Sequence, residues 1–190
     1  VYIVRTGIND WTLVYLTKVN SFTLDQGAAA IAWFEVGGFL GIIVAGWLSD
    51  KIFSGKRVPY IIFSSLCLIP LLLLMPSSFG TGVVGQYIIM ALIGFFIFGP
   101  QLLVGLAAAE VVNKKAACTA NGFAGCFAYL GAAFTGYPLG KIIDTYSWDG
   151  FFIIMLSCTC ICALISIVLI SNFDIVSIKT SKSRTLKSST

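Results

Sequence analysis

Long apolar runs that are almost free of charge restrict what this sequence can fold into. They cover residues 1–17, 28–49, 59–76, 83–109, 117–140 and 151–172. A helix needs about 20 predominantly apolar residues to cross a bilayer. With 58% hydrophobic and only 11% charged residues, the chain has too few polar groups to cover a water-facing exterior. The sequence therefore predicts an all-α, polytopic membrane protein with six transmembrane helices over residues 1–172.

Basic residues are distributed unevenly between successive connections. Every second connection, together with a tail over residues 173–190, carries most of them: Lys51, Lys56, Arg57, Lys114, Lys115, Lys179, Lys182, Arg184 and Lys187. The remaining connections carry only Lys18 and Lys141. Lys and Arg accumulate on the cytoplasmic side of membrane proteins. We therefore expect both termini and the basic tail in the cytoplasm. The net charge of +4 reflects this topology and gives no reason to expect a nucleic-acid partner.

Ionisable residues inside apolar runs are candidates for function, because charge in a membrane is costly. Arg5 and Asp10 lie about 140° apart on an ideal helix, so we do not expect them to pair with each other. Arg5 offers planar donors that fit a phosphate or a carboxylate. Substrate contact, a structural ion pair and a membrane anchor are all compatible with its position. Glu35 has no charged residue on its own helix, so it is either protonated or paired with another helix.

The stretch GWLSDKIFSGKR, residues 46–57, is the strongest local pattern. It combines a small residue, an acid and several bases in a tight turn: Gly46, Asp50, Lys51, Lys56 and Arg57. Asp50 could cap the N-terminus of a neighbouring helix, and the bases could pair across the bundle. SGKR is no nucleotide-binding loop, because its glycine and hydroxyl are misplaced for that motif.

Patterns typical of enzymes and metal sites are absent from the sequence. There is no His, no nucleophile elbow and no pair of acids. The C-x-C-x-C of residues 158–162 places Cys158 and Cys162 on one helix face and Cys160 on the opposite one. Packing of small apolar side chains explains these thiols better than a metal does. We expect no enzyme, no cofactor and no metal site.

GWLSDKIFSGKR resembles the second copy of the cytoplasmic loop motif of the major facilitator superfamily, between its helices 8 and 9. Further stretches resemble its organophosphate:phosphate antiporter family: RTGINDW, FEVGGFLG, FFIFGPQLLVGLAAAE and CTANGFAGCFAYLGAAFTGYPLGKIIDTYSWDGFF. The resemblance covers nearly the whole chain except the tail and is greatest to hexose-phosphate transporters and sensors. It implies the C-terminal six-helix half, partnered by an N-terminal six-helix half, in a bacterial inner membrane.

The resemblance also implies roles for individual residues. Members of this family exchange a phosphorylated sugar or glycerol for inorganic phosphate by alternating access. Arg5 would grip the phosphate, Asp10 and Glu35 would form gating ion pairs, and three aromatic residues would line the substrate cavity: Tyr2, Phe98 and Tyr129. Glycerol-phosphate members have Tyr where this chain has Phe98, and RYG where it has RTG, which favours a hexose phosphate.

Three functions follow from the sequence. The leading one is a secondary antiporter that exchanges a hexose 6-phosphate for inorganic phosphate. The second is a membrane receptor that binds a hexose phosphate and signals to a partner kinase with little transport. The third is a structural protein with six spans and no ligand. The pocket residues would be shared by the first two, so the sequence does not separate them.

Overall fold

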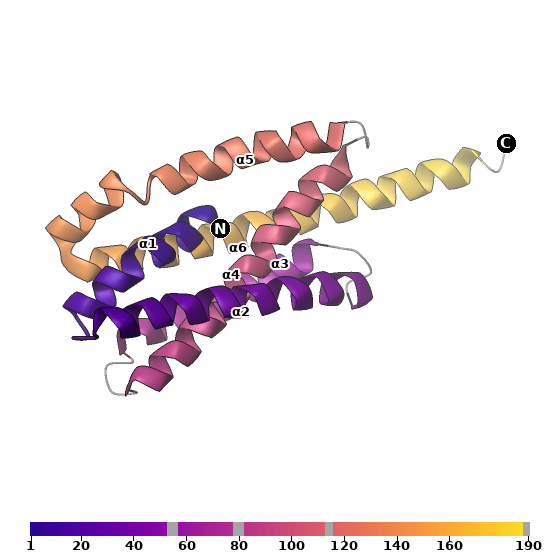
Figure 1. Ribbon diagram of the computed structural model, residues 1–190. Helices are drawn as coiled ribbons and strands as arrows, with labels where there is room; N and C mark the ends of the chain where they lie inside the picture. Colours follow the sequence, from indigo (N-terminus) through magenta and orange to yellow (C-terminus); the bar gives the residue numbers. More distant parts are fainter. Residues whose placement is uncertain (53–56, 78–81, 113–115, 188–190) are drawn as a thin grey trace.

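The structure, a computed structural model, describes residues 1–52, 57–77, 82–112 and 116–187. Every regular element in this part of the chain is a helix, as the sequence predicts. The elements are α1 (Tyr2–Lys18), α2 (Leu24–Lys51), α3 (Val58–Ser77), α4 (Gly82–Val111), α5 (Ala117–Ala133) and α6 (Tyr137–Lys187). They form a bundle in which α4 runs diagonally between the others (Figure 1).

The ends of the bundle agree with the alternation of basic residues. The C-terminal ends of α2, α4 and α6 lie at one end (Figure 1). Lys51 closes α2 there, and Arg57 precedes α3. The N-terminal residue of the chain lies near the middle of the bundle's length (Figure 1). The first turns of α1 therefore lie about halfway along the bundle, a level called mid-depth below.

Four stretches of described residues are long and apolar enough to cross a membrane: Leu24–Lys51, Val58–Pro76, Gly82–Glu110 and Ala117–Leu169. The last includes α5 and the part of α6 up to Leu169. The backbone leaves helical geometry at Ser147, and the chain turns back between the first turns of α6 and the rest of that helix (Figure 1). The membrane-protein class is thus supported by length and hydropathy. That the chain crosses the membrane six times stays a prediction.

The helix bounds differ from the expected ones where backbone hydrogen bonding decides them. α2 begins at Leu24 because Thr23 and Gln26 form a capping box, in which each backbone N–H donates to the other's side chain. α5 ends at Ala133 instead of residue 140, because Pro138 has no N–H to donate to the carbonyl of Phe134. α6 runs on to Lys187, so its backbone continues into the expected tail.

The closest helix contact joins α2 and α4. A Cβ atom added at Gly37, Gly41 or Gly94 would collide with a backbone carbonyl of the opposite helix. Gly37 and Gly41, one helical turn apart, form a row of small residues that lets two membrane helices approach backbone to backbone. This contact fixes α4 relative to α2 and so fixes the residues that both helices carry at mid-depth.

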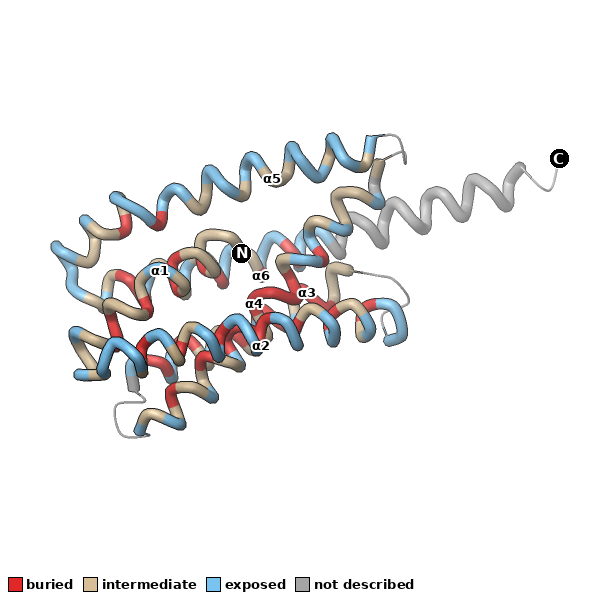
Figure 2. The backbone as a smooth tube through the Cα atoms, in the orientation of Figure 1, coloured by how far each residue is buried: buried red, intermediate tan, exposed pale blue. Residues whose placement is uncertain are grey.

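Burial is uneven across the bundle. Buried positions lie on α1, α2, α3 and α4, whereas α5 is largely exposed (Figure 2). No described residue of α5 is buried. Its exposed large side chains include Phe123, Phe127, Tyr129 and Leu130. α5 therefore presents an apolar surface that no described part of this chain covers.

Candidate functional site

Three of the residues singled out in the sequence meet at mid-depth. The guanidinium carbon of Arg5, on α1, lies 4.3 Å from the centroid of the Phe98 ring on α4. Its Nη2 atom lies 3.9 Å from Oε1 of Glu35 on α2. Both charged side chains keep solvent access, with 33% of Arg5 and 47% of Glu35 exposed. The sequence identified Arg5 without a partner, and the structure supplies Glu35 as one.

The Arg5–Glu35 contact is a loose ion pair. At 3.9 Å it is longer than a charge-assisted hydrogen bond, which spans about 2.7–2.9 Å. Neither group is held by a short bidentate contact to the other among the described residues. Arg5 consequently keeps donors that can turn towards an anion, and Glu35 lies close enough to offset part of its charge.

Phe98 lies beneath Arg5 and is not an open wall of a cavity. It is only 7% exposed, packs edge to face against Phe34 at 5.4 Å, and fills the space beside Gly38. A Cβ at Gly38 would lie 2.6 Å from the Phe98 ring. The glycine therefore makes room for the ring that carries the guanidinium. A cation above an aromatic face is attracted by about 0.5–2 kcal/mol.

The two tyrosines singled out in the sequence contact each other. The rings of Tyr2 on α1 and Tyr129 on α5 pack edge to face, with centroids 5.9 Å apart and an interplanar angle of 62°. Tyr129 is exposed. Tyr2 lies on the same helix as Arg5, about one turn towards its N-terminus, and its contact with Tyr129 joins α1 to α5.

Asp10 stands apart from this cluster. Its side chain is exposed, and its described contact is with its neighbour: Asn9 donates Nδ2–H to Oδ1 at 3.4 Å. The structure therefore brings Arg5 and Glu35 together but does not add Asp10 to them. That Asp10 forms a gating ion pair stays a prediction. It requires a partner other than Arg5 or Glu35, or another conformation.

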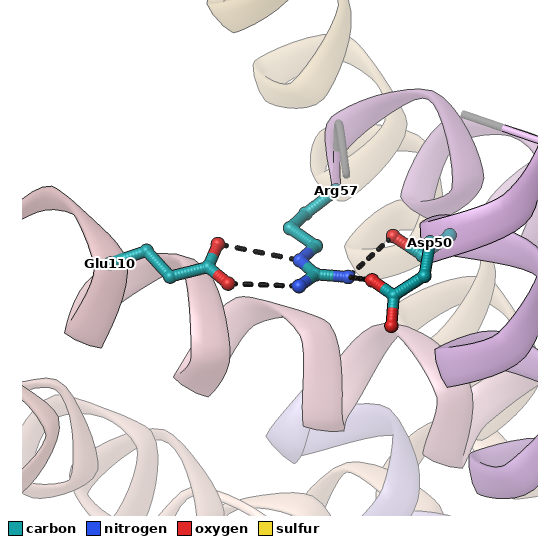
Figure 3. Close-up of polar contacts among 4 residues, drawn as sticks. Asp50, Arg57 and Glu110 are labelled. Atoms are coloured by element: carbon teal, nitrogen blue, oxygen red, sulfur yellow. Dashed lines mark hydrogen bonds and ion pairs between the residues drawn. The ribbon is translucent and has the colours of Figure 1, made fainter. Parts of the chain in front are cut away.

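Arg57 organises the other cluster, at the basic end of the bundle (Figure 3). Its Nη1 donates to Oδ1 of Asp50 at 2.5 Å and to Oγ of Ser49 at 3.0 Å. Its Nε and Nη2 donate to the two carboxylate oxygens of Glu110 at 3.3 and 2.8 Å. Arg57 thus connects the end of α2 to the end of α4 at the start of α3.

The electrostatics of Arg57 follow from these bonds. The hydrogen bond to Glu110 raises the pKa of the guanidinium, against the opposing effect of burial, and Asp50 raises it further. Arg57 therefore stays charged at every physiological pH. Pairing across the bundle was expected for Arg57, but Glu110 was missed. Glu110 is a single acidic residue directly after the apolar run 83–109, and this position could have indicated a partner for a basic residue at the same end.

The other residues of the loop motif are less engaged. The Nζ atom of Lys51 lies 5.3 Å from the Trp47 ring centroid. Nothing lies within 4 Å of a Cβ added at Gly46. Lys56 lies outside the described residues. Asp50 binds Arg57, and no described contact joins its carboxylate to a helix N-terminus.

The sequence profile described as the Major Facilitator Superfamily matches residues 2–187. The chain belongs to this superfamily. A probable hexose phosphate transport protein of Chlamydia trachomatis is 45% identical over 89% of this chain and 36% of its own length. The membrane sensor protein UhpC of Escherichia coli is 47% identical over 82% of this chain and 35% of its own length. A hexose-6-phosphate:phosphate antiporter of Salmonella typhimurium is 33% identical over 88% of this chain and 38% of its own length.

These relatives support the organophosphate:phosphate antiporter resemblance stated from the motifs. The chain spans little more than a third of the length of these relatives. As a superfamily member it is a multi-pass membrane protein with bacterial relatives. No group of three or more potential metal ligands occurs among the described residues.

Proposed function

We propose that this chain is the C-terminal half of a secondary antiporter that exchanges a hexose 6-phosphate for inorganic phosphate. One observation carries the proposal. Arg5 is held at mid-depth on the Phe98 ring, partly exposed, and only loosely paired with Glu35. Substrate sites of such transporters lie near the bilayer midplane. A guanidinium in this state can exchange a carboxylate for a phosphate.

The second half of the clamp would come from the N-terminal six helices. A phosphate carries more charge than one guanidinium neutralises, and alternating access requires two halves that move against each other. Asp10 and Glu35 would exchange ion-pair partners during this movement. Tyr2 and Tyr129 would border the sugar, and Phe98 would act through Arg5. The cytoplasmic end would be the basic one, with both termini inside a bacterial inner membrane.

A hexose phosphate is favoured over glycerol 3-phosphate. A relative named a probable hexose phosphate transport protein reaches 45% identity. A glycerol-3-phosphate transporter of Bacillus subtilis is 36% identical. The antiporter from Salmonella typhimurium is only 33% identical, so identity alone does not decide the substrate. The residue at position 98 and the RTG sequence carry the preference.

The test is exchange by the complete protein in liposomes loaded with phosphate. We expect uptake of labelled glucose 6-phosphate that requires internal phosphate. Arg5→Lys should reduce exchange at least tenfold, because Lys keeps the charge but lacks the planar fork. Arg184→Lys, the same change in the basic tail, is the control. Wild-type rates for Arg5→Lys would remove Arg5 from the phosphate site.

A receptor is the second candidate, because one relative is named a membrane sensor protein. Such a receptor would bind the hexose phosphate and signal to a partner kinase. Glucose 6-phosphate binding that depends on Arg5, without uptake at any internal phosphate concentration, would favour it. Neither binding nor uptake would contradict both candidates and leave a structural role.

A further inference from the structure

An interruption of the helical backbone at residues 134–136, called the break below, separates α5 from α6 close to α1. The N–H groups of Phe134, Thr135 and Gly136 donate to the carbonyls three residues earlier, at 3.1, 2.9 and 3.4 Å. These tight turns replace the regular helical pattern. The break lies inside an apolar stretch that is long enough to cross a membrane. Irregular backbone at such depth is tolerated only where other groups satisfy its polar atoms.

Trp11 supplies such a group from another helix. Its indole Nε1–H donates to the carbonyl oxygen of Thr135 at 2.7 Å, a contact between residues 124 positions apart. The Thr135 hydroxyl donates to the Ala132 carbonyl at 2.7 Å. Thr135 is 1% exposed and Trp11 is half-buried, so the hydrogen bond between them is partly shielded from solvent. The break is therefore pinned to α1 by a specific polar contact.

The packing around Trp11 fits the ring closely. A Cβ added at Gly140, just after the break, would lie 3.0 Å from Cη2 and 3.2 Å from Cζ2 of the indole. One turn back along α1, a Cβ at Gly7 would lie 3.6 Å from Leu139 and 2.7 Å from Met155. The buried side of the break thus faces α1, while Phe134 and Tyr137 are exposed on the other side.

The same helix carries Arg5. Trp11 and Arg5 are separated by about 9 Å of helix rise, and α1 has no proline or internal break between them. Rotation or sliding of α1 would therefore move both side chains together. A change at the break that displaces the indole is transmitted to the guanidinium above Phe98.

We propose that Trp11 is a positioning residue: its N–H bond to the Thr135 carbonyl sets the break between α5 and α6 as a hinge and, through α1, sets the position of Arg5. The inference rests on the proposed function for its link to phosphate binding. The hydrogen bond itself is independent of transport. Opening the hinge would let the first turns of α6 move relative to α5 and would shift Arg5 away from Phe98.

Removal of the bond should change both the hinge and the kinetics. Trp11→Phe removes the N–H and retains an aromatic ring. Gly140→Ala retains the N–H and displaces the indole. One net hydrogen bond shifts a two-state equilibrium by about 2- to 10-fold. We expect each variant of the complete protein to raise KM for phosphate by such a factor. Trp33→Phe, an exposed tryptophan on α2, is the matched control.

Two readouts do not depend on transport. In the complete protein, the indole N–H of Trp11 should exchange with deuterium at least tenfold faster in Gly140→Ala than in the wild type, as measured by NMR. Spin labels at Phe123 on α5 and Thr145 on α6, in a cysteine-free background, report the hinge. Their distance distribution should broaden or shift in Trp11→Phe and in Gly140→Ala and stay unchanged in Trp33→Phe.

The outcomes separate this inference from the proposed function. Equal exchange rates of the Trp11 N–H in Gly140→Ala and the wild type, or an unchanged distance distribution in both variants, would overturn the hinge. A protected indole and a shifted distribution in a protein without phosphate exchange would support the hinge and overturn the antiporter. Gly140→Ala keeps the test valid should Trp11→Phe fail to fold.

Discussion

At the scale of single residues, the guanidinium of Arg5 is positioned by an aromatic ring but only loosely paired with a carboxylate. Phe98, seated beside Gly38, fixes the plane above which the guanidinium lies. Glu35 balances the charge without gripping it, at 3.9 Å and with both side chains partly exposed. A tightly paired arginine would have to lose a short ion pair before it could bind an anion. The loose pair lowers that cost.

Substitution of Phe98 tests this arrangement. Phe98→Leu in the complete protein removes the aromatic face beneath Arg5 and keeps an apolar side chain. The lost cation–π attraction, about 0.5–2 kcal/mol, should raise the KM for glucose 6-phosphate by about 2- to 30-fold. Phe39→Leu, at an exposed position of α2, should leave KM unchanged. Equal KM values for Phe98→Leu and wild type would remove the ring from the site.

Ser147 offers a second test at this scale. Its φ of 58° and ψ of −163° lie in a region that glycine adopts far more readily than other residues. Ser147→Gly should relieve strain and raise the melting temperature in detergent by a few degrees, whereas Ser147→Ala keeps the Cβ and should give no gain. A lower melting temperature for Ser147→Gly would show that the Ser147 side chain stabilises this turn.

Residue-level chemistry was only partly predictable from the sequence. Arg5 and Glu35 could be identified because each is an isolated charge in an apolar run. Their pairing could not, because it depends on how α1 and α2 are rotated against each other. Glu110 was missed for the same reason: its partner, Arg57, is 53 positions away. The burial of Phe98 likewise depends on Gly38 of a different helix.

At the scale of elements, the contact between α2 and α4 holds the site together. Glu35 and Phe98 sit on these two helices, and Gly37 and Gly41 allow their backbones to meet. This packing could be predicted, because small residues at helical spacing have few other uses in a membrane. The end of α5 could not be placed correctly, because apolar composition continues through the break at residues 134–136.

Two glycine substitutions separate packing from helix propensity. Gly37→Ala adds a methyl group that collides with the Ala91 carbonyl of α4, so the helices must separate. We expect a clear loss of melting temperature and of folded yield in detergent. Gly46→Ala adds the same methyl where nothing lies within 4 Å, and should be neutral or stabilising, since alanine favours a helix by up to about 1 kcal/mol. Equal stability of the two variants would contradict the α2–α4 contact.

At the scale of the whole molecule, the exposed apolar surface of α5 and the cluster at Arg5 have one explanation in common. We expect both to belong to the side of the bundle that the proposed second half covers. The chain spans 36% of the length of its relative from Chlamydia trachomatis. The isolated chain of 190 residues should therefore neither exchange phosphate nor bind it tightly. Measurable exchange by these residues alone in liposomes would contradict this.

Orientation in the membrane gives the last prediction. The basic end of the bundle carries Lys51, and the opposite end carries the turn around Ser147. Basic residues favour the cytoplasmic side. In a cysteine-free form of the complete protein, Thr145→Cys should react with an impermeant maleimide in intact cells. Lys51→Cys should react only after the membrane is opened. Both positions are exposed, so a difference in labelling reports the side of the membrane. The reverse pattern would invert the topology and place the Arg57 cluster outside the cell.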